Sequence, residues 1–234
     1  MAWVVLDDFE SGGFGEGWTI NNNALTVGVT WVLEGTYSVN IDTDAIDYAP
    51  NTRLKITHSK FIERNSSDNP TIRGLIYDNT GNKMANNNHT GIMFFISDTN
   101  NYYYTGVRRT DSNYDHYFLS KVVDGVETVL SSGTKSEPIG PAIRAVEVKA
   151  TSGSIVATFY SDTSYSTQFD MPLSTTDTTF TSGAIGISCD ISMSAGQGIT
   201  STSAVDKIEY FSELQIQRRI SKVSSMMGVQ SIII

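Results

Sequence analysis

Residues 90–130 read TGIMFFISDTNNYYYTGVRRTDSNYDHYFLSKVVDGVETVL and predict four consecutive antiparallel strands. The runs Ile92–Ile96 and Tyr102–Arg109 are each followed by a cluster of Asp, Asn, Ser and Thr, whose short polar side chains bond to the local backbone and favour turns. After a third, alternating run, Asp124-Gly125 is the dipeptide that a tight type I′ hairpin turn prefers. One face of this meander is expected to be buried, and the other to carry aromatic and charged side chains.

The rest of the chain up to residue 212 repeats this pattern of short apolar runs and polar turns. Turn clusters recur roughly every ten residues, as in two-sheet sandwiches. Further strands are predicted at Trp3–Phe9, Leu25–Leu33, Tyr37–Ile41, Thr52–Ile62, Ile72–Tyr77, Ile143–Ala150, Ile155–Tyr160, Gly183–Ile191 and Ala204–Phe211. The expected fold is all-β, a two-sheet antiparallel jelly-roll sandwich over residues 1–212.

Residues 213–234 form a tail of different character. Ile216, Ile220, Val223 and Met227 recur at helical spacing, and Gly228 precedes a strand-like run, Val229–Ile234. We expect a short helix and strand here. The apolar residues can fold back on their own sandwich, or the tail can be donated to a neighbouring copy as an assembly element of a homo-oligomer.

Composition excludes several classes of function. The net charge of -9 argues against binding nucleic acid, because phosphate contacts require clustered Lys and Arg. No run approaches the roughly 18 apolar residues of a membrane span, and no signal peptide is visible at the start. The single cysteine, Cys189, rules out an internal disulfide and is expected to be a buried thiol.

Five segments, in this order, resemble the concanavalin-A-like lectin/glucanase jelly roll in its laminin-G-like and carbohydrate-binding-module forms. They cover residues 3–212 and indicate the fold more strongly than the function. The segments are LDDFESG (6–12) with Trp18-Thr19, LEGTYSV (33–39), NYY (101–103) with GVR (106–108) and LSKVVDG (119–125), SGAIGI (182–187), and VDKIEY (205–210).

The resemblance implies a structural Ca2+ where the first and last strands meet. The matching residues are Asp8, Glu10 and Asp206, with a backbone carbonyl near Gly35. Carboxylates and carbonyls are the oxygen ligands that Ca2+ prefers. The alternative is that these acids are solvated strand ends.

A sugar-binding surface is predicted around the β-meander. Tyr102, Tyr104, Tyr114 and Tyr117, with Trp18 and Trp31, are candidate platforms for a pyranose ring, and Arg108 and Asp111 can bond to its hydroxyl groups. Because successive side chains of a strand point to opposite faces, at least one residue of the Tyr102-Tyr103-Tyr104 run is expected in the core. The competing interpretation is that these aromatic residues fill the sandwich.

Catalysis is not expected. Glucanases of this fold carry their acids on one strand in a Glu-x-Asp-x-x-Glu pattern, which this sequence lacks. The leading hypothesis is a non-catalytic, extracellular module that binds a glycan or cell-surface polysaccharide. The alternative is a structural or decoration protein of a virus particle that assembles through residues 213–234, and a glycoside hydrolase is the third.

Overall fold

The computed structural model describes residues 3–20, 25–28, 35, 38–41, 52–64, 68–79, 88–111, 114–136, 143–191 and 202–212. All regular structure in these residues is β, which confirms the predicted all-β class. The strands are β1 (Val4–Asp7), β2 (Trp18–Ile20), β3 (Leu25–Gly28), β4 (Ser38–Ile41), β5 (Thr52–Glu63), β6 (Thr71–Asn79), β7 (Asn88–Asp98), β8 (Asn101–Asp111), β9 (Tyr114–Val123), β10 (Val126–Ser136), β11 (Ala145–Ala150), β12 (Ile155–Tyr160), β13 (Leu173–Thr175), β14 (Ser182–Ile191) and β15 (Thr202–Phe211).

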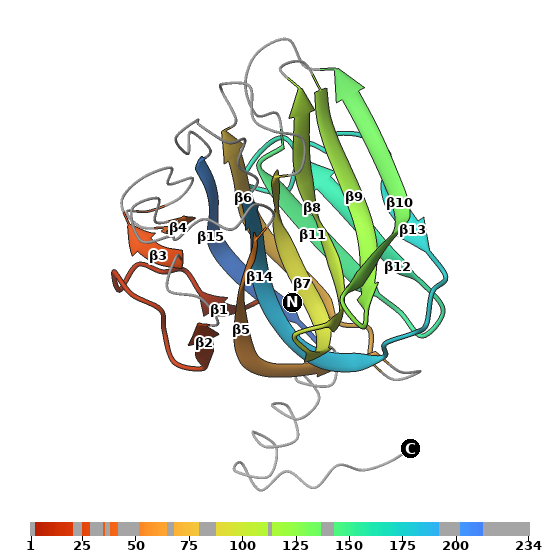
Figure 1. Cartoon of the computed structure of the whole chain (residues 1–234), viewed down its shortest axis with the longest axis horizontal. Helices are drawn as coiled ribbons and strands as arrows, with labels where there is room; N and C mark the ends of the chain where they lie inside the picture. The colour runs from red at the N-terminus through yellow and green to blue at the C-terminus, as the bar shows by residue number, and fades with distance from the viewer. Residues whose placement is uncertain are drawn as a thin grey trace, which may run out of the picture.

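Two antiparallel sheets form the sandwich (Figure 1). One has seven strands in the order β10-β9-β8-β7-β14-β5-β2. The other has eight, in the order β13-β12-β11-β6-β15-β4-β3, with β1 beside β15. In Figure 1 the green strands β8 to β10 lie in front of β11 to β13, so the two layers are seen face-on.

The central meander is confirmed as strands β7 to β10. Asp98 pairs with Asn101 across the first turn and Asp111 with Tyr114 across the second. At the third turn Asp124 and Gly125 both have positive φ, 51° and 79°, the conformation that a type I′ turn requires. The composition of these turns therefore specified the hairpins directly.

Apolar side chains pack on both faces of the seven-stranded sheet. Its inner face contributes Ile92, Tyr103 and Leu119 to the core between the sheets. A second buried cluster on the opposite face consists of Met93, Ile96, Tyr102, Tyr104, Phe118 and Val122. The single open face that the sequence led us to expect is therefore not present over these strands.

Two glycines allow β7 and β8 to approach closely. Gly91 pairs with Gly106 across the two strands. A Cβ atom on Gly106 would lie 2.1 Å from the carbonyl oxygen of Thr90, far inside van der Waals contact. Glycine is needed at both positions because any side chain would push the two backbones apart.

Five connections outside the described residues leave from strand ends that lie at one end of the sandwich. In the seven-stranded sheet, Thr52 pairs with Ile191, Asp111 with Tyr114, and Ser136 with Tyr114. In the other sheet Thr202 pairs with Asn79. We call this the loop end; the arrowheads of β8 and β10 mark it in Figure 1. The connections are 42–51, 80–87, 112–113, 137–142 and 192–201.

Candidate functional site

Three of the predicted stacking residues are buried. Tyr102, Tyr104 and Tyr117 have exposed fractions of only 1%, 0% and 4%. Their predicted exposure is wrong because both faces of the seven-stranded sheet are packed. Tyr102 and Tyr104 belong to the outer cluster, whereas Tyr117 lies in the core between the sheets. The expectation that part of the Tyr102–Tyr104 run is core is confirmed by all three side chains.

The hydroxyl groups of two core tyrosines anchor the segment between β12 and β14. Tyr117 donates a 2.7 Å hydrogen bond to Asp170, and Tyr103 donates one to Asp177. Because β8 and β9 are neighbours in the seven-stranded sheet, the two bonds tie this segment to it at two points. A polar group on a buried ring is expected to find such a partner.

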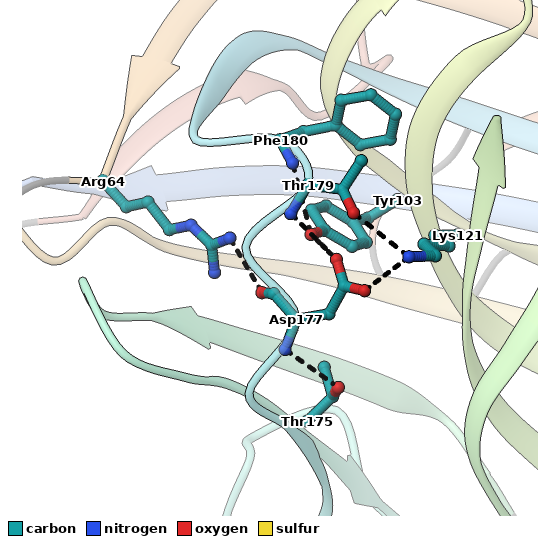
Figure 2. Close-up of polar contacts among 7 residues, drawn as sticks. All are labelled: Arg64, Tyr103, Lys121, Thr175, Asp177, Thr179 and Phe180. Carbon is teal, nitrogen blue, oxygen red and sulfur yellow. Dashed lines mark hydrogen bonds and ion pairs between the residues drawn. The ribbon is translucent and has the colours of Figure 1, made fainter.

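Asp177 is the centre of a compact polar cluster (Figure 2). Its carboxylate accepts hydrogen bonds from Tyr103, from the Lys121 ammonium at 2.6 Å and from the Thr179 amide at 2.9 Å. Its backbone carbonyl accepts a 2.9 Å bond from the guanidinium of Arg64, which is almost fully buried. Figure 2 shows Arg64 and Lys121 reaching the segment from opposite sides.

The protonation states of this cluster suit a structural role. Burial opposes the ionisation of Asp177, but hydrogen bonds from Lys121 and Tyr103 outweigh it and hold the pKa of the carboxyl well below its ordinary value. Burial, together with the bond to Asp177, raises the pKa of Tyr103 to about 12. Burial and Asp170 likewise raise that of Tyr117 to about 12. The phenols therefore stay neutral near pH 7, as donors to fixed carboxylates.

The sequence did not reveal this cluster. Lys121 alternates with Tyr117 and Leu119, two core residues, which is the one signal that it faces inward. Asp177 lies in a Ser- and Thr-rich segment without periodicity, and its partner Lys121 is 56 positions away.

The other predicted sugar-contacting residues lie near the loop end. Arg108 pairs in register with His116, and Asp111 with Tyr114, so all of them belong to the outer part of the β8–β9 hairpin. The side chains of Arg108, Asp111 and Tyr114 are outside the described part of the chain, as is Trp31. Trp18 is half-buried, and its indole nitrogen donates a 2.7 Å bond to Asp7.

The residues that the resemblance assigned to calcium meet at one pocket. Asp8, Glu10, Gly35 and Asp206 line it, together with Lys207. Asp206 is buried at a bulge of β15, whereas Asp8 and Glu10 are exposed. The Glu10 carboxylate lies directly against Gly35, whose φ is +82°.

A neighbouring carboxylate shapes the loop that carries Glu10. Asp7 accepts hydrogen bonds from the amides of Phe9 at 2.7 Å and Gly15 at 2.8 Å, and another from Trp18. These bonds fold residues 8–15 back toward β1 and β2, which fixes the position of Asp8 and Glu10.

The pocket offers the kinds of ligand atom that Ca2+ binds, but its carboxylates are not close enough to one another to coordinate the ion. Carboxylates and a backbone carbonyl are suitable oxygen ligands. Among the described residues, however, no three His, Cys, Asp or Glu side chains are grouped tightly enough to hold a metal ion. Lys207 also lines the pocket, and its ammonium group lies 3.5 Å from the Glu209 carboxylate.

Comparisons with known proteins identify the fold of this chain. No family model matches the sequence, and no curated protein matches it. Carbohydrate-binding module CBM66 from Bacillus subtilis is a structural match at 16% identity, over 82% of this chain and 93% of that chain, with a TM-score of 0.50. The exoplasmic/lumenal domain of VIP36, bound to Ca2+ and Man2, matches at 10% identity over 86% of this chain and 85% of that chain, with a TM-score of 0.53.

A third match is part of a larger protein. The xyloglucan PUL GH43B of Bacteroides ovatus matches at 15% identity over 88% of this chain, with a TM-score of 0.54, but this chain spans only 38% of its length. At these identities the matches show the fold alone. This chain has the fold of the concanavalin-A-like lectins and glucanases, as its sequence resemblance implied.

Proposed function

We propose that this chain is a non-catalytic module that binds a glycan or cell-surface polysaccharide at its loop end. The observation that carries this proposal is that the strand ends from which five connections leave lie at one end of a lectin-like sandwich. Four of the five connections, 42–51, 80–87, 112–113 and 192–201, contain Asn, Asp, Ser or Thr, which supply donors and acceptors for sugar hydroxyls, whereas 137–142 contains none of these residue types. The binding partners of CBM66 and VIP36 support the ligand class.

The tip of the β8–β9 hairpin supplies the residue types that sugar recognition needs. Arg108 offers several N–H donors and Asp111 two acceptor oxygens, and Tyr114 provides a flat ring with a hydroxyl group. Asp111 and Tyr114 are register partners, so their backbones are adjacent. With Tyr102, Tyr104 and Tyr117 buried, this tip is the part of the predicted surface that we retain as the ligand site.

Screening the full chain on a glycan array, followed by calorimetry on the ligands found, tests this proposal. We expect Arg108→Ala, Asp111→Asn and Tyr114→Ala each to weaken binding at least about tenfold, because each removes a polar or stacking contact. Met171→Ala serves as the matched control, because Met171 is 77% exposed and lies outside the hairpin. Unchanged affinity in all three hairpin variants would refute the location, and an array without ligands would refute the function.

Binding rather than hydrolysis is proposed because the sequence lacks the paired acids of the glucanases. None of its glutamates begins a Glu-x-Asp-x-x-Glu pattern. A glycan that binds should therefore be recovered intact after long incubation with the protein.

We also propose that the pocket formed by Asp8, Glu10, Gly35 and Asp206 binds a structural Ca2+. The pocket that these carboxylate residues share supports this, with Ca2+ drawing the exposed Asp8 and Glu10 side chains toward Asp206, and the bound form of VIP36 supports the choice of ion. Ca2+ at 100 times its Kd should stabilise the fold by about 2.7 kcal/mol relative to EDTA. Asp206→Asn should abolish this response, whereas Asp98→Asn, in an exposed turn, should keep it. Equal melting temperatures of the wild type in Ca2+ and EDTA would contradict the site.

The second candidate function is assembly, as a structural or decoration protein of a virus particle or at another extracellular surface. The apolar spacing within residues 213–234, outside the described residues, favours it. Within the described part of the chain, no helix is long and apolar enough to cross a membrane. A light-scattering mass well above 25.6 kDa for the full chain would support assembly, and a monomer would exclude it.

A further inference from the structure

The edge strands of the two sheets differ greatly in length. β13 and β3 close the eight-stranded sheet with three and four residues, and β2 closes one side of the other sheet with three. β10 closes the remaining side with eleven residues. Natural proteins keep edge strands short because the unpaired backbone groups of a long edge recruit other strands. β10 departs from this pattern.

The β10 edge is also apolar where it begins. Val126 and Val129 are 69% and 55% exposed, two of the few large apolar side chains at the surface of the described residues. A bulge between Val129 and Ser131 and the charged residues Glu127 and Lys135 are the features of this strand that commonly protect an edge. β13 packs close to β10, but among the described strands only β9 is hydrogen-bonded to it.

The tail supplies a segment that suits this edge. Val229–Ile234 contains four β-branched apolar residues in six, the composition of an added strand. The charged residues of the tail are Glu213, Arg218, Arg219 and Lys222, so it is basic, while the whole chain has a net charge of -9. Electrostatic attraction therefore draws the tail of one copy toward the acidic body of another. Residues 213–228 span about 24 Å as the predicted helix and about 50 Å when extended.

We infer that β10 of one copy accepts residues 229–234 of a neighbouring copy as an additional strand of the seven-stranded sheet. Backbone hydrogen bonds would provide the affinity, and Val126 and Val129 would be covered. This inference rests on the assembly candidate and adds to it the acceptor surface. The contact is heterologous, because donor and acceptor are different parts of the chain.

Light scattering on full-length variants tests the inference. The acceptor variant is Val126→Lys/Val129→Lys, the donor variant is Ile232→Asp/Ile234→Asp, and Met171→Lys is the control at an equally exposed apolar site. We expect oligomers for the wild type and the control, and 25.6 kDa monomers for the other two. Mixing the acceptor and donor variants should restore a dimer, because each retains one intact half of the contact.

Each contrary result has a distinct meaning. A monomeric wild type overturns both the assembly candidate and this inference. A donor variant that becomes monomeric while the acceptor variant stays oligomeric leaves the tail as an assembly element but overturns β10 as its acceptor. An acceptor variant that becomes monomeric while the donor variant stays oligomeric, or a mixture that stays monomeric, overturns pairing between tail and edge.

Discussion

At the residue scale, Asp177 holds the segment between β13 and β14 against the seven-stranded sheet. Asp177→Asn removes the charge that Lys121 and Tyr103 contact, and leaves a largely buried ammonium group without its carboxylate. We expect chemical denaturation to show a loss of about 2 kcal/mol in the free energy of unfolding. Asp98→Asn, in an exposed turn, should cost less than about 0.5 kcal/mol. Equal losses in the two variants would contradict a special role for Asp177.

The same residue makes part of the stability dependent on acid pH. The pKa of Asp177 is lowered in the folded state, so its contribution is present above the unfolded carboxyl pKa of about 4 and is lost as the pH falls below it. The difference in unfolding free energy between the wild type and Asp177→Asn should therefore shrink below about pH 4. A difference independent of pH would show that the charge is not what stabilises the cluster.

Two tyrosines make a corresponding prediction at alkaline pH. Because Tyr103 and Tyr117 each have a pKa raised to about 12, their contribution to stability is present below pH ~10 and is lost as the pH rises toward 12. Ultraviolet titration should show late phenols that include these two, beside Tyr160, whose pKa burial also raises, and Tyr103→Phe and Tyr117→Phe should each remove one. Titration of every tyrosine near pH 10 would contradict the buried, carboxylate-bound environment of Tyr103 and Tyr117.

At the scale of elements, close contact between β7 and β8 depends on Gly91 and Gly106. Gly106→Ala places a methyl group against the backbone of Thr90, and we expect it to cost about 1–3 kcal/mol. Gly153→Ala is the matched control, because a Cβ there meets nothing within 4 Å. Thermal unfolding of both variants measures the contrast, and similar melting temperatures would argue against the close approach.

The elements were the most predictable level of this structure. Asp124-Gly125 specifies its hairpin through backbone conformation, so a local signal was enough to predict β9 and β10. The burial of Tyr102 and Tyr104 was not predictable, because alternation separates the two faces of a strand without saying that both are covered. The Asp177 cluster depends on partners far apart in the sequence, which no local pattern encodes.

At the scale of the whole molecule, the fold sets where a ligand site can lie. The resemblance assigned Asp8, Glu10, Gly35 and Asp206 to a Ca2+ site, and the structure brings these residues to one pocket because they lie where the first and last strands meet, which the fold fixes. It could not place the sugar contacts, because loops that vary in sequence form such sites on a constant scaffold. The loop end is therefore where we propose the ligand site.

The most direct test of the proposed function is hydrogen exchange, by mass spectrometry, of the full chain with and without a glycan found on the array. We predict slower exchange in peptides covering residues 108–115 and the adjoining loop-end connections, with no change in β11 and β12. Protection confined to the outer face of the eight-stranded sheet, or to β10, would contradict a sugar-binding site at the loop end.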